Sequence, residues 1–444
     1  VPTSIPFKEY AKMISDLPCR VDSFPDIEGI VARYSALGLT NEQMAANPVW
    51  VDKTGNGHDI QLKNFSWKGM SGVGGYEMNF NLWRNNVSSI PDISMSTTTT
   101  SVSVSVGNST YNNNLIYIHI SNWDINKNHW LKVTSTYEDG DLAFIFYNNS
   151  NTKKIGLPAN GYVNILAYPE FKGSYMYIST TSNKQGSFTI EQLPLYPGAL
   201  VFDGVDDWAG CDNLPLLPKE KGYSIIALRN WITRYDATQY KRPLISNLDT
   251  NDEGAFLIEY RKDENVNDVT GSYNSFTDVY IDDNNPITWQ TSSSYNGQII
   301  KKVTSKSTNN LCICKTYFGQ LSNYANAAIW EIVILDHDAT EEELTKIKDY
   351  FVKTYPWLFP DQAWTVTGKT NEDEDRATIA NITGNGNDLV LSNFGFAEGS
   401  GYNEEGEYAG YLVTDGVDDK IVSSIFKMGN DWTVIGDWEL INTG

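Results

Sequence analysis

Alternating apolar and polar positions dominate the middle of the chain. Ser101 to Val106 alternates serine with valine, Leu142 to Tyr147 is rich in aromatic residues, and turn pairs such as Asp139-Gly140 separate runs of this kind. Such short runs of β-branched and aromatic residues predict strands. Thr340 to Phe351 instead has helical spacing, with a capping box at Thr340 and Glu343 and with Pro356 beyond its end. We expect an all-β protein with one clear helix.

The first 45 residues depart from this pattern. Phe7 to Ile14 places its apolar residues at helical intervals, Ile27 to Tyr34 is a mixed stretch, and Thr40 with Gln43 has the spacing of a capping box. We expect residues 1–45 to form short helices and linker ahead of the first β domain.

Two parts of the chain repeat one another. The matched pairs, in the same order in both copies, are Thr54-Gly-Asn-Gly57-His-Asp59 with Thr383-Gly-Asn-Gly386-Asn-Asp388, Asp203-Gly-Val-Asp-Asp207 with Asp415-Gly-Val-Asp-Asp419, and Tyr223 to Ala227 with Trp432 to Gly436. Three shared elements in one order indicate a duplicated unit.

The spacing within the two copies differs. Thr54 precedes Asp203 by 149 residues and Thr383 precedes Asp415 by 32, so the first copy carries about 117 extra residues. That is the size of a domain. We expect a discontinuous first unit (46–78 and 198–357), an inserted β-sandwich (79–197) and a second, truncated unit (361–444). A chain with an incomplete second copy and no initial Met is expected to be a fragment of a longer protein.

Charge and composition limit the partners. The chain has 33 Lys and Arg against 55 Asp and Glu, a formal net charge of −22, which argues against nucleic acid and anionic membranes as partners. No apolar run approaches the length of a membrane-spanning helix, so membrane insertion is not expected. Four cysteines are too few for a disulfide framework or a zinc site.

Several of these motifs together resemble a known family. Asp52-x-Thr-Gly-Asn-Gly-x-Asp59, Phe202-Asp-Gly-Val-Asp-Asp207 and Glu331 to Asp336 with its following helix resemble the laminin-G-like, concanavalin A-like jelly roll. The sequences of Asn64 to Gly72 and of Ile190 to Gly198 are similar to segments of fibre or appendage proteins from phages and prophages of gut bacteria. The resemblance implies a jelly-roll sandwich and a binding role, and it implies no chemistry.

The Asp-Gly-Val-Asp-Asp motif is a candidate metal site. Asp203, Asp206 and Asp207 cluster carboxylates of the kind that calcium prefers, and some laminin-G-like domains bind calcium at a sandwich rim. The alternative is a turn in which the aspartates accept hydrogen bonds from backbone amides. We favour the turn, and we expect no metal and no other cofactor.

Candidate catalytic residues are sparse. Glu331 and Asp336 lie five apart on one expected strand, so they face opposite ways and cannot act as a glycosidase pair. The four histidines (His58, His119, His129 and His337) lie in no hydrolase motif. Cys312 and Cys314 are expected on one strand face as buried free thiols. The loops at 235–240 and 282–289 combine aromatic and polar residues and remain candidates for a sugar-binding rim.

Three functions remain open at this point. The first is a non-enzymatic virion appendage subunit, forming a homo-oligomer that binds neighbouring subunits or host-surface glycans. The second is a secreted bacterial carbohydrate-binding module, located outside the cell or at its surface. The third and weakest is a glycoside hydrolase.

Overall fold

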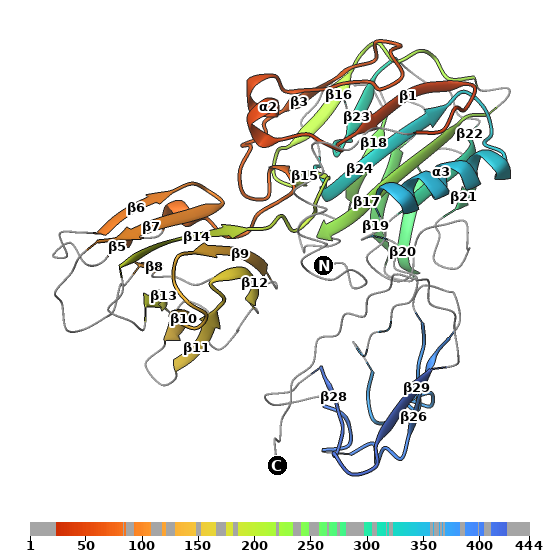
Figure 1. Cartoon of the computed structure of the whole chain (residues 1–444). Helices are drawn as coiled ribbons and strands as arrows, with labels where there is room; N and C mark the ends of the chain where they lie inside the picture. The colour runs from red at the N-terminus through yellow and green to blue at the C-terminus, as the bar shows by residue number, and fades with distance from the viewer. Residues whose placement is uncertain are drawn as a thin grey trace.

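The computed structural model describes most of the chain and is built mainly from antiparallel sheets (Figure 1). The all-β prediction is therefore confirmed. The described residues are 24–82, 84–85, 93–107, 118–120, 129–147, 152–165, 175–180, 185–218, 222–233, 241–247, 257–263, 266–272, 276–280, 297–303, 309–316, 318, 323–355, 358, 364, 366, 369–381, 387–397, 399–403 and 410–423.

Two seven-stranded sheets form the first sandwich. The first sheet has the order β21 (Phe276–Tyr280), β22 (Gly297–Val303), β17 (Ser224–Thr233), β24 (Asn326–Leu335), β15 (Leu200–Asp203) and β4 (Gly72–Val73), with β1 (Ile30–Ser35) also on β24. The second sheet has the order β2 (Val49–Trp50), β3 (Ile60–Lys63), β16 (Trp208–Cys211), β23 (Leu311–Ile313), β18 (Lys241–Ser246), β19 (Leu257–Asp263) and β20 (Val266–Ser272).

Large apolar side chains hold these two sheets together. Trp50, Phe202 and Ile329 are fully buried in one cluster that draws on both sheets. Each such side chain contributes roughly 1.5–3 kcal/mol by leaving water. Strand β24 is almost continuously apolar because both of its faces are buried, one in this cluster and the other in a second apolar cluster.

Strand β1 overturns the prediction for the N-terminal segment. Ile30–Ser35 pairs antiparallel with the second half of β24, where Ser35 lies opposite Glu331 and Ile30 opposite Leu335. The expected helix or linker over Ile27 to Tyr34 is therefore wrong, and β1 is part of the first sandwich. The capping box is confirmed, since Thr40 and Gln43 begin the short helix α2 (Asn41–Ala46). Phe7 to Ile14 lies outside the described residues.

Helix α3 (Glu341–Thr354) covers the outer face of the first sheet. Its predicted capping box is present, because the Thr340 and Glu343 side chains each bond to the other residue's backbone amide. Leu344, Ile347 and Phe351 pack against apolar residues of β17 and β24. The helix prediction is confirmed.

The residues between Met78 and Leu193 contain two further sheets of five strands each. One has the order β11 (Thr152–Leu157), β10 (Leu142–Tyr147), β13 (Tyr175–Thr180), β8 (Ile118–Ile120) and β5 (Arg84–Asn85). The other has the order β12 (Asn160–Ile165), β9 (His129–Ser135), β14 (Gly186–Gln192), β7 (Ser101–Val106) and β6 (Ile93–Thr97). A separate apolar cluster that includes Phe144, Phe146 and Phe188 lies between them.

Backbone bonds close the chain where these residues leave the first sandwich and return to it. The amide of Leu195 donates to the carbonyl of Gly75, and the amide of Tyr196 donates to the carbonyl of Gly74. Entry and exit are thus adjacent, the geometry that an inserted unit requires.

The C-terminal residues repeat part of the first sandwich. One small sheet has the order β25 (Thr378–Ile379), β26 (Leu389–Ser392) and β29 (Lys420–Ser423), and β27 (Gly401–Tyr402) pairs with β28 (Leu412–Val413). By the sequence match these strands correspond to β2, β3 and β16, and to β4 and β15. Shared bonds support the match, since Asn41 caps the Val73 backbone as Asn371 caps that of Tyr402.

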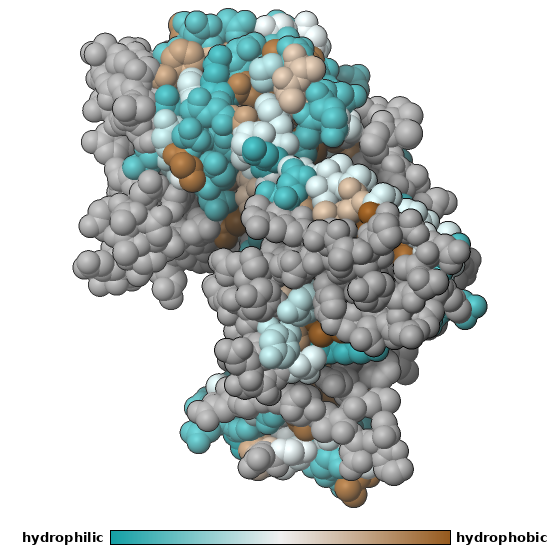
Figure 2. Space-filling model, turned by 90° about the vertical axis from the view of Figure 1, so that its left-hand side faces the viewer, coloured by the Kyte–Doolittle hydropathy of each residue, from teal (hydrophilic) through white to brown (hydrophobic). Residues whose placement is uncertain are grey.

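The visible surface is mainly polar. On the face drawn in Figure 2, the apolar residues among those described are scattered rather than joined in one patch. No helix within the described ranges has the length and apolar character needed to cross a membrane.

Candidate functional site

The Asp203 corner is a tight turn whose carboxylates accept backbone amides. Asp203 Oδ1 accepts the amides of Val205, Asp206 and Asp207 at 2.8, 3.3 and 3.4 Å. Asp207 Oδ2 accepts the amide of Asp203 at 3.1 Å. Gly204 has a φ of +77°, the left-handed conformation that glycine adopts without strain.

The second copy reproduces this corner bond for bond. Asp415 Oδ1 accepts the amides of Val417, Asp418 and Asp419 at 2.8, 3.3 and 3.5 Å, and Asp419 Oδ2 accepts the amide of Asp415 at 2.8 Å. A bonding pattern that persists while the neighbouring residues change is the signature of a structural turn.

The corner has some features of a cation site. One carboxylate oxygen from each of Asp203, Asp206 and Asp207 lies within 4.8 Å of the others. However, Asp203 already accepts three amides, and burial raises the pKa of Asp207 to about 7. A carboxyl group that resists ionisation is a poor calcium ligand, and calcium takes about six to eight oxygens. The geometry favours the turn.

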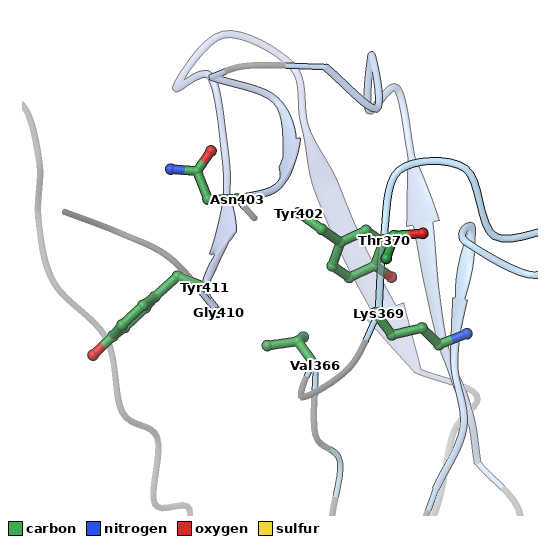
Figure 3. Close-up of a pocket in the computed structure, with 7 residues that line it drawn as sticks. All are labelled: Val366, Lys369, Thr370, Tyr402, Asn403, Gly410 and Tyr411. Carbon is green, nitrogen blue, oxygen red and sulfur yellow. The ribbon is translucent and has the colours of Figure 1, made fainter. Parts of the chain in front are cut away.

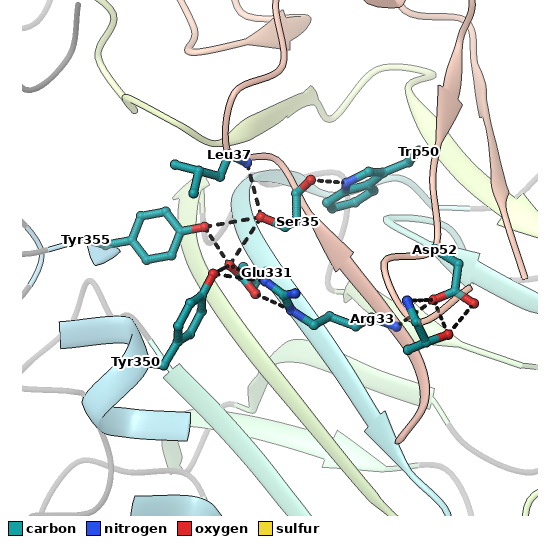
Figure 4. Close-up of polar contacts among 9 residues, drawn as sticks. Arg33, Ser35, Leu37, Trp50, Asp52, Glu331, Tyr350 and Tyr355 are labelled. Atoms are coloured by element: carbon teal, nitrogen blue, oxygen red, sulfur yellow. Dashed lines mark hydrogen bonds and ion pairs between the residues drawn. The ribbon is translucent and has the colours of Figure 1, made fainter. Parts of the chain in front are cut away.

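Glu331 is the centre of a buried polar network (Figure 4). Its Oε2 accepts from Arg33 Nε at 3.1 Å, and its Oε1 accepts from Tyr350 at 2.6 Å, Tyr355 at 2.8 Å and Ser35 at 3.1 Å. Burial raises the pKa of Glu331, while the Arg33 charge and the Tyr350 bond oppose that rise.

The network joins three elements. Arg33 and Ser35 come from β1, Glu331 from β24, and Tyr350 from α3. The Arg33 guanidinium also lies over the Phe24 ring, 4.0 Å from its centre. With both carboxylate oxygens engaged and the side chain fully buried, Glu331 clamps the fold and is not placed to meet a substrate.

A local irregularity places Glu331 in this network. The register between β17 and β24 shifts at Glu331, which leaves Trp330 without a direct partner on β17, and Trp330 packs on the α3 side of the sheet. Such a bulge resets the alternation of faces. The sequence predicts Glu331 on a strand, five residues before Asp336, and does not predict this network. Its position within an apolar run was the available signal for a buried charge.

The histidines occupy structural positions where they are described. The His58 carbonyl accepts the Tyr34 hydroxyl at 2.6 Å, as the carbonyl of its counterpart Asn387 accepts from Trp364 at 2.9 Å. His337 lies beside Asp336 and Glu343, at 3.0 and 3.2 Å. His119 and His129 lie on β8 and β9, and their side chains are outside the described part of the structure.

The cysteines differ in part from expectation. Cys312 and Cys314 are buried free thiols, as predicted, and Cys211 is a third. Burial raises the pKa of Cys211 to about 11 and of Cys312 to about 12. Cys314 packs in the core with Leu311 and Ile313, so it does not share a face with Cys312. The cause is its left-handed φ of +58°, which ends the strand alternation. The sugar-rim loops 235–240 and 282–289 lie outside the described residues.

A small surface pocket opens in the second unit (Figure 3). Its volume is about 240 Å³, below the roughly 300–1,000 Å³ of typical ligand pockets. Its lining residues are Val366, Lys369, Thr370, Tyr402, Asn403, Gly410 and Tyr411. Lys369 is engaged by Asp375 at 2.7 Å and Tyr402 by the Arg376 carbonyl at 2.8 Å, so the pocket suits at most a small polar group.

Comparison with known proteins gives little. No family model and no curated protein matches the chain. A solved structure described as "Life in the extremes: atomic structure of Sulfolobus Turreted Icosahedral Virus" is similar at 12% identity and a TM-score of 0.14, covering 72% of this chain and 68% of that one. A similarity this weak supports no conclusion about fold or function.

Proposed function

We propose that this chain is a non-enzymatic, fibre-like appendage subunit of a bacteriophage virion. Its sandwich units would project from the particle and bind host-surface glycans or neighbouring subunits, as a homo-oligomer. In this proposal each duplicated unit is a laminin-G-like jelly roll, and the residues between Met78 and Leu193 are a β-sandwich nested in the first.

One observation carries the proposal: the acidic groups serve as scaffold. The Glu331 carboxylate accepts hydrogen bonds from Arg33, Tyr350, Tyr355 and Ser35. The Asp203 carboxylate accepts three backbone amides of its turn. A hydrolase needs a carboxyl pair open to its substrate, at about 5–9.5 Å. Carboxylates used in this way support a role in architecture and binding.

The duplication supports the same proposal. Two copies keep the same corner bonds although their flanking residues differ, as at His58 and Asn387 or Trp208 and Lys420. Repetition of one folded unit lengthens a protein, as a projecting appendage requires. The resemblance to phage fibre proteins found in the sequence adds the virion context.

The full chain should be tested on an array of bacterial surface glycans, with product analysis on the same glycans. We expect retention of at least one glycan class and no release of reducing ends. Glu331→Gln should leave retention unchanged, since its side chain is buried away from any ligand. Turnover that is lost on changing one carboxylate would overturn the proposal.

The alternative is a secreted bacterial carbohydrate-binding module. Glycan binding by sandwich domains fits either setting. The genes beside the full-length gene separate the two functions: virion structural genes favour the appendage, and glycan-degrading enzymes favour the module.

A further inference from the structure

Lys315 is an ammonium group held against an aromatic ring in the first sandwich. It exposes 6% of its surface, and its Nζ lies 3.9 Å from the centre of the Trp208 ring. Within the described part of the chain, this ammonium has neither an ion pair nor a hydrogen bond. Burial lowers its pKa, and no carboxylate acts against that shift. A buried charge of this kind lacks the partner that usually accompanies it.

The surroundings of Trp208 fix the ammonium in place. The Phe318 ring meets Trp208 edge-on, with centroids 6.0 Å apart. A Cβ on Gly210 would lie 2.8 Å from Trp208 and 3.2 Å from Phe318, so both rings pack closely over that glycine. The cation therefore lies against a closely packed aromatic ring, and such an interaction is weaker than that with a counter-ion.

Further polar groups stand beside this pair. Lys63 is exposed and lies directly across from Trp208 in the β3–β16 register, so the two residues share one face of the sheet. Asp206, two residues before Trp208, is exposed at the corner and offers acceptor oxygens. The nearby Thr316 hydroxyl is buried and has no hydrogen-bond partner.

The second unit differs at three of these positions. Lys420 stands at the position of Trp208, Val422 at that of Gly210, and Ser392 at that of Lys63. The fold of the corner does not need Trp208 or Lys63, because the second copy forms the same corner without them. Their presence in the first unit points to a ligand.

We propose that Lys315, Lys63 and Trp208 form a binding site for a carboxylated saccharide, such as a uronic-acid residue of a surface polysaccharide. The ligand carboxylate pairs with the Lys315 ammonium over Trp208 and with Lys63. The sugar hydroxyls donate to Asp206. This inference rests on the proposed glycan-binding function and assigns its ligand class and position.

The site explains a charge that is otherwise costly. A sugar carboxylate supplies the counter-ion that is missing among the described residues, and charge-assisted hydrogen bonds of this kind are about twice as strong as neutral ones. The net charge of −22 disfavours anions at long range, but that field is screened beyond about 8–10 Å in physiological salt.

Binding of the full chain to polygalacturonate and to the neutral polymer dextran tests the site. We expect binding to polygalacturonate that weakens with salt, and none to dextran. Lys315→Met keeps most of the aliphatic stem and should weaken binding by at least about tenfold. Lys420→Met removes an ammonium group from the second unit, at the position that matches Trp208, and should stay within about twofold.

A footprint on the unaltered protein covers the case in which Lys315→Met does not fold. Acetylation of Lys315, followed by mass spectrometry, should slow in the presence of galacturonate and not of galactose. Unchanged acetylation, or wild-type binding by Lys315→Met, would overturn the site. If the array shows retention of neutral glycans only, the site fails while the proposed function stands; if no glycan is retained, both fail.

Discussion

Arg33 and Glu331 are 298 positions apart and meet as a buried ion pair, with 3.1 Å between Nε and Oε2. Arg33 brings β1 to the pair and Glu331 brings β24, while Tyr350 ties helix α3 to the same carboxylate. One contact thus fastens an N-terminal strand, a central strand and the covering helix. Loss of this contact should lower the stability of the whole first sandwich.

Glu331→Ala should destabilise the first sandwich by about 3–5 kcal/mol, because it leaves the Arg33 charge buried and unpaired. The double variant Arg33→Met, Glu331→Leu should recover much of that loss by replacing the pair with apolar groups. Chemical denaturation measures both. Glu342→Ala removes an exposed pair with Lys346 and should cost far less, because solvent screens such a pair. A Glu331→Ala protein as stable as this control would show that the network is not a clamp.

The attachment of α3 should depend on pH through His337. Burial alone would lower the pKa of His337, but its bonds to Asp336 and Glu343 outweigh burial and raise it. A folded pKa above the unfolded value of about 6.5 gives stability that is full below that value and is lost as the pH rises through the folded pKa. The hydrogen-exchange protection factors of the first turn of α3, which correct for the base-catalysed intrinsic exchange rate, should therefore fall from pH 6 to pH 8.

His337→Asn should remove that pH dependence while it keeps a polar side chain. The pKa of Glu343 is lowered, despite burial, by its bonds to Thr340 and His337, so its contribution is lost as the pH falls through that lowered value. The helix start should thus be firmest between about pH 5 and 6.5. Equal protection factors at pH 6 and pH 8 in the wild type would contradict this prediction.

Asp207→Asn should have an effect that changes with pH. Burial raises the pKa of Asp207 to about 7, so the folded protein holds the neutral acid more readily than the unfolded chain does. The stability from this group is present at low pH and declines as the pH rises from about 4 to 7. The stability of the Asn variant relative to wild type should therefore be higher at pH 8 than at pH 5. Asp419→Asn, at the part-exposed matching position, serves as the control in the same thermal melts.

The two corner glycines separate backbone strain from crowding. Gly204 and Gly416 have φ of +77° and +72°, but only at Gly204 would a Cβ meet Asn326, at 2.7 Å. Gly416→Val should cost about 1–3 kcal/mol from strain alone. Gly204→Val should cost more, because Asn326 lies on β24 and has little room to move. Urea denaturation of each variant measures the loss of stability. Equal losses for the two variants would show that the contact with Asn326 adds no steric cost.

The inserted residues should be separable from the first sandwich. Replacing 79–191 with a short Gly-Ser linker keeps Leu195 and Tyr196, whose amides bond to Gly75 and Gly74. The shortened protein should fold, with the amide dispersion and cooperative melting of a native sandwich. A molten product would mean that the two units share one core.

The sequence by itself determined the features that depend on neighbouring residues. The capping boxes at Thr40 and Thr340, the strand alternation of Ser101 to Val106 and the duplicated Asp-Gly-Val-Asp-Asp corner all lie within a few residues of chain. Local hydrogen bonds and side-chain periodicity fix such elements, so their residues carry the signal directly.

Tertiary structure decided the rest. Ile30–Ser35 is a strand because β24 offers it an edge 298 residues away, and its mixed sequence alone did not favour a strand. The bulge at Trp330 turned Glu331 toward α3, and the left-handed φ of Cys314 moved that thiol into the core. Lys315 lies beside Trp208 because β23, which ends two residues before Lys315, pairs with β16. Contacts between distant segments depend on how sheets stack, and no local pattern records that stacking.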